Sequence, residues 1–228
     1  MPNDWKRRDI LRAGAAALAP AAMAAPAAKL PDEVRVAILG FDGHTGEAVE
    51  VARHDRRVRI VAYETTSPRE DARARSAKDV LEGARHYRDY RQLLDREKLD
   101  AVCICDINSR RAESVVACLE RGLPTAAEKP LGIAIGELER IRETAARTRT
   151  PLTMLLPMRF DPKFVAMKQA VESGAIGEPV NLSGQKSYQV NERPEWMTKR
   201  ATFGGTIPYI ACNTVDLLRF ISGRDMVA

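Results

Sequence analysis

Histidine is scarce in this sequence of 228 residues, and its distribution limits the sites that the chain can form. The three histidines are His44, His54 and His86, so none lies in the later part of the chain. A proton-transfer residue in that part must therefore be of another type. The four cysteines have neither the spacing of a zinc site nor that of a disulfide framework. We therefore expect no metal site and no disulfides.

Long apolar runs and a strong excess of one charge are also missing. Beyond the N-terminal segment, no apolar run is long enough to span a membrane. The formal net charge is +5, but four basic residues fall within residues 1–12. The other basic residues are dispersed among acids, as in Arg69-Glu70-Asp71. We expect a mixed, solvated surface with no nucleic-acid partner and no stable membrane span.

The N-terminal segment has the pattern of an export signal. Lys6-Arg7-Arg8 precedes an alanine-rich apolar run, Ala13–Ala25, with small residues where a signal is cleaved. The paired arginines followed by Ile10-Leu11 resemble a twin-arginine signal, which is read by the twin-arginine export machinery. We expect residues 1–25 to be this signal, residues 26–32 a linker, and the protein periplasmic or otherwise exported. The alternative is an uncleaved amphipathic or disordered N-terminus.

Residues 33–157 alternate between strand and helix patterns. The strands are expected at 34–39, 59–63, 85–87, 101–105, 123–127 and 152–156. Helical patterns separate them, among them 71–82, 90–94, 112–121 and 133–147. Unbroken apolar strands that alternate with helices are typical of parallel sheets buried on both faces. This stretch therefore predicts a doubly wound parallel sheet of the Rossmann type.

A glycine-rich turn links the first strand to the first helix and predicts a dinucleotide site. Gly40, Gly43 and Gly46 are spaced G-x-x-G-x-x-G, with His44 and Thr45 between the last two. Glycines allow backbone to approach a pyrophosphate closely, and the helix N-terminus favours its negative charge. The expected cofactor is NAD, with NADP possible. The alternative is a glycine turn in a βα unit that binds nothing.

Polar residues at the ends of two later strands extend this candidate site. Glu64, at the end of the second strand, can accept a hydrogen bond from the adenosine ribose 2′-hydroxyl, which favours NAD. Arg69 could instead meet a 2′-phosphate, and Glu64 could simply be a solvated strand-end carboxylate. Asp106 and Asn108 follow the strand 101–105 and belong to the same predicted cofactor site.

The run Glu128-Lys129-Pro130 places a lysine at the end of an apolar strand. Lysine is rarely buried unless its charge or its donors are used. Pro130 keeps Lys129 out of the helical region, so its ammonium is expected at the strand end, where open α/β sheets bind ligands. The alternative is a turn with an exposed lysine.

The order of motifs resembles the glucose–fructose oxidoreductase, inositol dehydrogenase and MocA (Gfo/Idh/MocA) family over residues 33–222. The residues that carry the resemblance are Leu99-Asp100-Ala101-Val102, Asn108, Glu113, Glu128-Lys129-Pro130, Arg159-Phe160-Asp161-Pro162, Ser173-Gly174-Ala175-Ile176-Gly177-Glu178, Gly204-Gly205-Thr206-Ile207-Pro208 and Asp216-Leu217-Leu218-Arg219. The family implies a Rossmann domain followed by an α/β domain with an open, mostly antiparallel sheet. It also implies hydride transfer between a sugar or polyol and bound nicotinamide.

The resemblance assigns roles to several residues. Lys129 would contact the substrate and the nicotinamide side of the cofactor. Glu128 would help to orient this lysine and the ribose of the cofactor, so both residues belong to the expected cofactor site. Arg159, Asn213 and Asp216 would contribute to substrate binding. Many members carry an aspartate and a histidine where this chain has Tyr209 and Asn213, and asparagine cannot take a proton. Tyr209 is then the candidate acid/base, although an ordinary, partly buried tyrosine is the alternative.

Further departures leave other functions open. The Thr-Pro-Asn turn of many members reads Asp106-Ile107-Asn108, and a common histidine after it is Arg111. The alternatives are an NAD-dependent glycosidase of the same family and a non-catalytic nucleotide- or sugar-binding protein.

Residues 158–228 resemble only the start of the family's C-terminal domain. Val180–Gly184 is expected to begin its sheet, and Val215–Ile221 to be helical with Gly223 at its end. Since members continue for several strands, we expect a truncated domain, from a fragment or a truncated gene. A homo-oligomer is possible for a full-length product.

Overall fold

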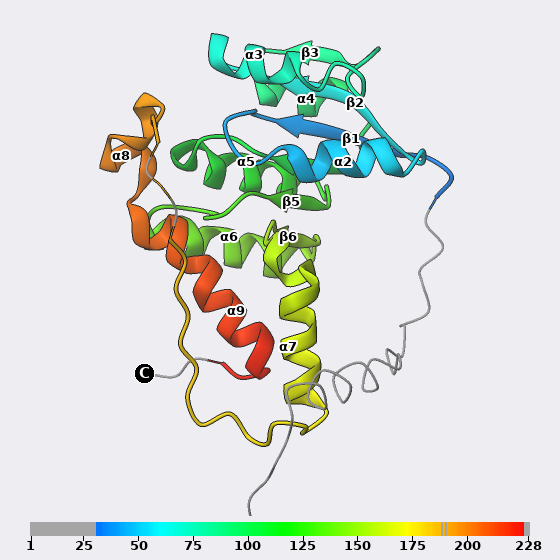
Figure 1. Ribbon diagram of the computed structural model, residues 1–228. Helices are drawn as coiled ribbons and strands as arrows, with labels where there is room; N and C mark the ends of the chain where they lie inside the picture. Colours follow the sequence, from blue (N-terminus) through cyan, green and yellow to red (C-terminus); the bar gives the residue numbers. More distant parts are fainter. Residues whose placement is uncertain (1–30, 188, 190, 226–228) are drawn as a thin grey trace, which may run out of the picture.

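The computed structural model describes residues 31–187, 189 and 191–225, and it is built around a six-stranded parallel sheet (Figure 1). The strand order is β3-β2-β1-β4-β5-β6. The strands are β1 Val34–Leu39, β2 Val58–Glu64, β3 Arg85–Tyr87, β4 Ala101–Ile104, β5 Thr125–Ala127 and β6 Leu152–Met154. The chain winds outward from β1 in both directions, so the predicted doubly wound parallel sheet is confirmed.

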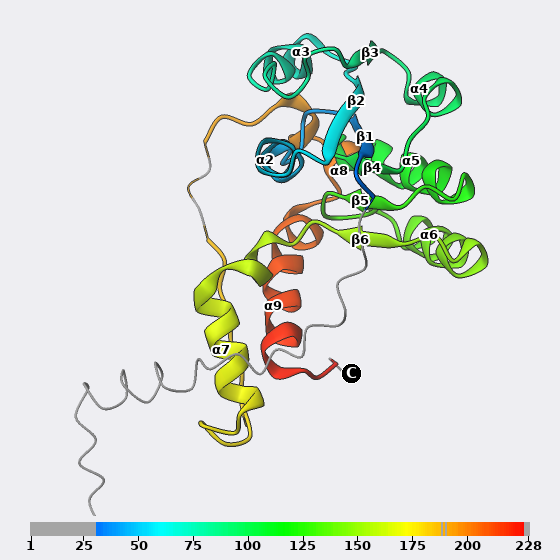
Figure 2. The same ribbon diagram turned by 90° about the vertical axis from the view of Figure 1, so that its right-hand side faces the viewer.

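Helices cover the two faces of the sheet (Figure 2). One face carries α2 (Gly46–His54) and α3 (Pro68–Arg75), and the other carries α4 (Tyr90–Arg96), α5 (Asn108–Glu120) and α6 (Ile135–Thr148). Successive side chains of a strand point to opposite faces of the sheet. The strands therefore contribute to two hydrophobic cores, one on each face. Ile38 and Cys103 pack on the α2 side, whereas Leu39 and Ile104 pack on the α5 side.

The prediction of a helix over residues 71–82 is wrong for the second half of that range. Helix α3 begins after Ser67, whose hydroxyl accepts a hydrogen bond from Glu70 N at 3.3 Å, and it ends at Arg75. Residues 76–80 form turns instead. These turns bury Ala77 and Leu81 in the core on the α2 side. Tertiary burial of two apolar residues therefore overrides a weak helical pattern.

The chain after β6 is mainly helical. It forms η1 (Pro157–Phe160), α7 (Pro162–Glu172), η2 (Glu195–Met197), α8 (Arg200–Phe203), the π-helical η3 (Ile207–Ala211) and α9 (Cys212–Ser222). Helices α7 and α9 lie side by side, away from the sheet (Figure 1). Helix α9 ends at Ser222 and is capped by Gly223, whose φ is 67°, so the glycine predicted at the end of this helix is confirmed.

The strand expected at Val180–Gly184 is not formed. Residues 181–184 have no regular secondary structure, and Val180 is 98% exposed. A strand needs a neighbour to satisfy its backbone groups. Within the described residues, no neighbouring strand pairs with this segment.

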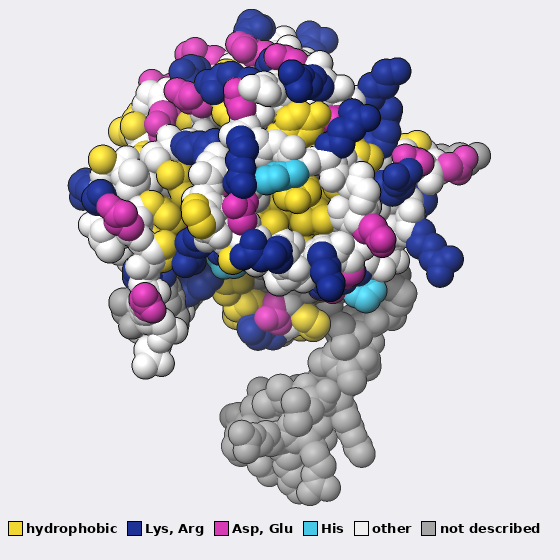
Figure 3. Space-filling model, turned by 90° about the horizontal axis from the view of Figure 1, so that it is seen from above, with side chains coloured by type: hydrophobic (Ala, Val, Ile, Leu, Met, Phe, Trp, Pro, Cys, Tyr) yellow, Lys and Arg dark blue, Asp and Glu magenta, His cyan; other side chains and the backbone are white. Residues whose placement is uncertain are grey.

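The surface is a mixture of charges. Figure 3, which shows the molecule from above, has lysine and arginine side chains interspersed with acidic ones and no basic stripe on this face. Among the described helices, none has the length and apolar character needed to cross a membrane. The predicted signal, 1–25, lies outside the described residues.

We predict that Gly40→Ala will destabilise the fold much more than Gly46→Ala. Gly40 has a φ of 76°, and a Cβ atom there would stand 2.5 Å from Asp106 Cα, whereas a Cβ at Gly46 would meet nothing within 4 Å. Steric overlap and a strained backbone should cost about 2–4 kcal/mol of unfolding free energy at Gly40. Urea denaturation of both variants measures this, and equal losses would contradict the packing described.

Candidate functional site

The glycine turn lies at the point where the sheet's winding reverses. Gly40 N donates to Glu64 O at 3.1 Å, and Gly43 N donates to Cys105 O at 2.6 Å, so the turn spans the ends of β2 and β4. A Cβ on Gly43 would be 2.8 Å from Glu128 Cγ, which leaves room only for glycine. Helix α2 begins directly after Thr45. Its first N–H groups and its positive dipole end form a suitable place for a pyrophosphate.

Helix α3 holds the glycine turn through side chains that the sequence did not single out. Glu70 Oε1 accepts from Phe41 N at 2.7 Å. The guanidinium of Arg73 donates to the carbonyls of Asp42 at 2.9 Å and Gly43 at 2.8 Å. These bonds direct the carbonyls of residues 42 and 43 toward α3 and fix the shape of the turn. Arg73 also adds a positive charge close to the predicted pyrophosphate site.

Glu64 is fully buried, so the alternative of a solvated strand-end carboxylate is wrong. Its Oε1 accepts from Arg110 Nη2 at 2.8 Å, and Arg110 Nε lies 3.2 Å from Asp106 Oδ2. Burial raises the pKa of Glu64 although Arg110 opposes this. Burial likewise raises the pKa of Asp106 to about 7, against the pull of Arg110. A direct contact between Glu64 and a ribose stays a prediction; in this structure Glu64 holds Arg110.

Arg111 joins the loop after β4 to the turn that carries Lys129. It is 1% exposed, and it donates to Asn108 Oδ1 at 3.0 Å, to Pro130 O at 2.6 Å and to the carbonyl of Asp106. Burial lowers the pKa of this guanidinium, although the charge of Glu128 opposes the shift. Asn108 belongs to the predicted cofactor site. In this structure its Nδ2 donates a hydrogen bond to Phe203 O at 2.8 Å.

Lys129 is buried at the end of β5, so the alternative of an exposed lysine in a turn is wrong. Its side chain is 6% exposed. The Nζ atom donates to Tyr209 O at 3.0 Å and lies 3.4 Å from the centroid of the Tyr209 ring. Burial lowers the pKa of Lys129, and the charge of Glu128 counteracts part of this shift. The site therefore holds an ammonium that is partly stripped of water.

Glu128 connects the glycine turn to Lys129. Its Oε1 accepts from His44 Nδ1, and its Oε2 accepts from Lys129 N at 3.0 Å. Burial alone would raise the pKa of Glu128, but the hydrogen bond to His44 and the charges of Lys129 and Arg111 lower it overall. The predicted cofactor turn and the predicted catalytic lysine thus share one carboxylate.

Of the site residues predicted after β6, some lie next to Lys129 and others do not. Tyr209 lies between Lys129 and Phe203, whose ring centroid is 5.0 Å away. Asn213 is buried and donates to Ile210 O at 3.2 Å. The substrate candidates on η1 and α9 instead bind each other, because Arg159 Nε donates to Asp216 Oδ2 at 2.7 Å. This ion pair ties η1 to α9.

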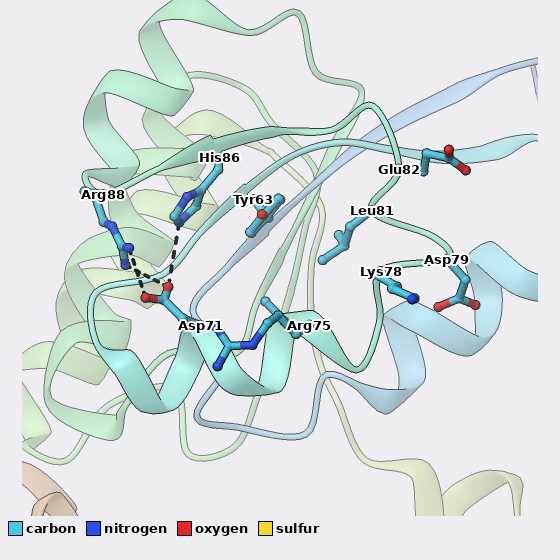
Figure 4. A pocket seen from close by; sticks show the side chains of 10 residues that line it. Tyr63, Asp71, Arg75, Lys78, Asp79, Leu81, Glu82, His86 and Arg88 are labelled. Carbon is cyan, nitrogen blue, oxygen red and sulfur yellow. Dashed lines mark hydrogen bonds and ion pairs between the residues drawn. The ribbon is translucent and has the colours of Figure 1, made fainter.

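A cavity of about 730 Å³ elsewhere is not this site (Figure 4). It lies between α3 and β3, where the Tyr63 and His86 rings stack at 4.8 Å and Asp71 is paired with Arg88. None of the predicted site residues lines it. Within the part of the chain that the structure describes, no cluster of three or more His, Cys, Asp or Glu side chains is placed to hold a metal ion.

We predict that Asp106→Asn will flatten the pH dependence of stability. A carboxyl with a pKa of about 7 binds more protons than the unfolded chain, where its pKa is about 3.9, so the free energy of unfolding falls as pH rises between these values. Arg110, Glu64 and Glu70 are the charged groups that act on it.

Urea denaturation at about pH 5 and about pH 8 tests this, and the wild type should lose more stability than Asp106→Asn. The exposed Asp95→Asn is the control and should follow the wild type. Parallel losses in all three proteins would contradict a raised pKa.

Comparison with known proteins finds two family matches. A family model described as "Oxidoreductase family, NAD-binding Rossmann fold" matches residues 34–155. The GFO/IDH/MocA C-terminal domain model matches residues 164–228.

Several relatives carry the names of inositol dehydrogenases. Myo-inositol 2-dehydrogenase of Thermotoga maritima is 28% identical over 166 residues, which are 73% of this chain and 48% of that protein. Inositol 2-dehydrogenase 2 of Saccharopolyspora erythraea is 30% identical over 159 residues, 69% of this chain and 45% of that protein. The chain thus spans about half the length of these relatives.

Solved structures share the fold. A Thermotoga maritima structure has a TM-score of 0.75 and 27% identity, and the match covers 84% of this chain and 59% of that one. GenD2 from gentamicin A biosynthesis, in complex with NAD, has a TM-score of 0.70 at 19% identity, with coverage of 86% and 55%. With a family model matched over more than half of its residues, the chain belongs to the GFO/IDH/MocA oxidoreductase family and contains its NAD-binding Rossmann domain.

Proposed function

We propose that the protein is an NAD-dependent dehydrogenase that oxidises a hydroxyl-bearing carbon of a sugar or polyol. The observation that carries this proposal is the buried ammonium of Lys129, which Glu128 links to the glycine turn. In the proposed complex this ammonium would lie where a substrate hydroxyl meets the reactive end of the cofactor. The names of the inositol dehydrogenase relatives support this substrate class.

The residues around the glycine turn fit NAD. Gly40 and Gly43 keep side chains out of the turn, and the N-terminus of α2 follows it. Arg73 and Glu70 preset the turn, so little reorganisation is needed on binding. When bound, NAD supplies the hydride acceptor, its nicotinamide ring.

Lys129 is the residue that would stabilise the reaction. When the substrate hydroxyl gives up its proton, negative charge develops on its oxygen, and a prepositioned ammonium in a site shielded from water would stabilise that charge. The charge is consumed as the C–O bond becomes a carbonyl and the carbon gives its hydride to the bound cofactor. Asn213 can orient the hydroxyl through its amide, but it cannot take the proton. Tyr209 holds Lys129 through its backbone carbonyl and its ring, and a role for its hydroxyl in proton transfer remains our prediction.

We predict that Lys129→Met will retain NAD binding and lose turnover. Methionine keeps much of the side-chain volume and removes the charge, so the rate of NAD reduction should fall by about 100-fold or more. Stopped-flow absorbance of the reduced ring measures turnover, and calorimetric titration measures NAD affinity. The exposed Lys78→Met is the control. Full turnover in Lys129→Met would remove this lysine from the mechanism.

A second candidate, nucleotide binding without turnover, is favoured by one observation. The family's usual proton acceptor corresponds to Asn213, which is buried and cannot accept a proton. A panel of sugars and polyols added to the NAD-loaded protein separates the two candidates. Reduction of NAD with any member supports the dehydrogenase, and NAD binding without reduction by any member supports the second candidate.

We also propose that the protein is exported by the twin-arginine machinery, which the pattern of residues 6–25 supports. Folding around NAD before export would then account for a nicotinamide enzyme outside the cytoplasm.

We predict that replacing Arg7 and Arg8 together with lysine will retain the protein in the cytoplasm. The export machinery reads the arginine pair itself, so conserving charge should not preserve export. Fractionation of cells followed by immunodetection measures the distribution, and Arg12→Lys is the control. Equal export of the two variants would overturn the proposed route.

A further inference from the structure

A second cavity, of about 350 Å³, lies beside the Lys129 site. It is lined by Lys186, Ser187, Arg193, Met197, Phe203, Thr206 and Ile210. Phe203 packs on the Tyr209 ring, whose face carries the ammonium of Lys129. Ile210 follows Tyr209 directly. The cavity is therefore separated from Lys129 by little more than one aromatic side chain.

The charged side chains that line the cavity are all basic. Lys186 and Arg193 line it, and among its lining residues in the described chain none is acidic. Lys129 loses basicity mainly through burial, and Lys186 is close enough for its charge to lower the pKa of Lys129 further. Two ammonium groups held near each other repel, so the arrangement favours a negatively charged occupant.

Lys186 differs from its neighbours because no carboxylate of the described residues forms an ion pair with it. Among the described lysines after β6, Lys163 lies 2.7 Å from Asp161 and Lys199 lies 2.5 Å from Glu195, and Lys168 pairs with Glu172. Lys186 is exposed, and its polar contact is with Met158 Sδ at 3.5 Å. Thioether sulfur is only a weak acceptor. The charge of Lys186 thus remains available to a ligand.

We propose that this cavity binds the anionic group, a carboxylate or a phosphate, of a sugar acid or sugar phosphate. The reacting hydroxyl of the same molecule then lies at Lys129. Charge-assisted hydrogen bonds from Lys186 and Arg193 give the anion its orientation. This inference rests on the proposed dehydrogenase function and narrows its substrate class from sugars and polyols in general to those that carry an anionic group.

Calorimetric titration tests the inference with three probes: glucose, glucuronate and glucose 6-phosphate. Each is titrated into the wild type with NAD present and again without NAD. At least one anion should bind about tenfold more tightly than glucose, the size of one charge-assisted hydrogen bond. The glucuronate and phosphate arms distinguish the two possible anionic groups.

Lys186→Gln should remove most of this preference, whereas Lys199→Gln, which changes a lysine already paired with Glu195, should leave it intact. Both side chains are exposed, so unchanged melting temperatures are expected and establish that the variants are folded. Glucose binding as tightly as both anions, or equal effects of the two variants, overturns the proposal. Failure of NAD to bind would count against the dehydrogenase function alone, because the titrations without NAD still decide the anion preference.

Discussion

The candidate site depends on the two hydrogen bonds that the carboxylate of Glu128 accepts. One oxygen accepts a hydrogen bond from His44 in the glycine turn, and the other accepts from the backbone N–H of Lys129. The same charge keeps an ammonium tolerable in a buried position, where desolvation would otherwise favour its neutral form. The glycine turn and Lys129, the predicted catalytic residue, are therefore held in position by the same side chain.

Arginine side chains hold the remaining parts of the site. Arg73 fixes the glycine turn from α3, Arg110 neutralises the carboxylates at the ends of β2 and β4, and Arg111 clamps the loop after β4 to the turn after β5. A planar guanidinium presents five donors in a fixed, fork-like arrangement, whereas the ammonium of lysine presents three donors on one atom. Asp106 and Glu64 each keep one buried carboxylate oxygen without a hydrogen-bond partner among the described residues. Burial is the main cause of the raised pKa of Asp106, and the nearby charges of Glu64 and Glu70 raise it further against the pull of Arg110.

Sequence periodicity was enough to predict the sheet and most of its helices. Apolar runs such as 34–39 and 101–105 are long and unbroken, and the glycine turn lies between a clear strand and a clear helix. The prediction of a helix at 71–82 was wrong because the burial of Ala77 and Leu81 in the core ends the helix early. The prediction of a strand at 180–184 was wrong because a strand needs a neighbouring strand to pair with.

The position of Lys129 and Glu128 at the end of a buried strand was predictable from the sequence, because a lysine next to a proline at a strand end is unusual. The roles of Glu70, Arg73 and Arg110 were not, since their partners lie 29 to 46 residues away in the chain. Arg111 carries a local signal besides its departure from the family pattern. It lies four residues before Val115 on the apolar side of α5, where an arginine must be buried and bonded.

The central claim is that Lys129 is a buried ammonium sustained by Glu128, and direct titration of its Nζ by nuclear magnetic resonance tests it. The resonance can be assigned by its loss in Lys129→Arg. The account predicts a pKa below the ordinary lysine value of about 10.4 in the wild type, and a further fall in Glu128→Gln, which removes the compensating charge. A wild-type value at or above that of an exposed lysine, unchanged in Glu128→Gln, would contradict it.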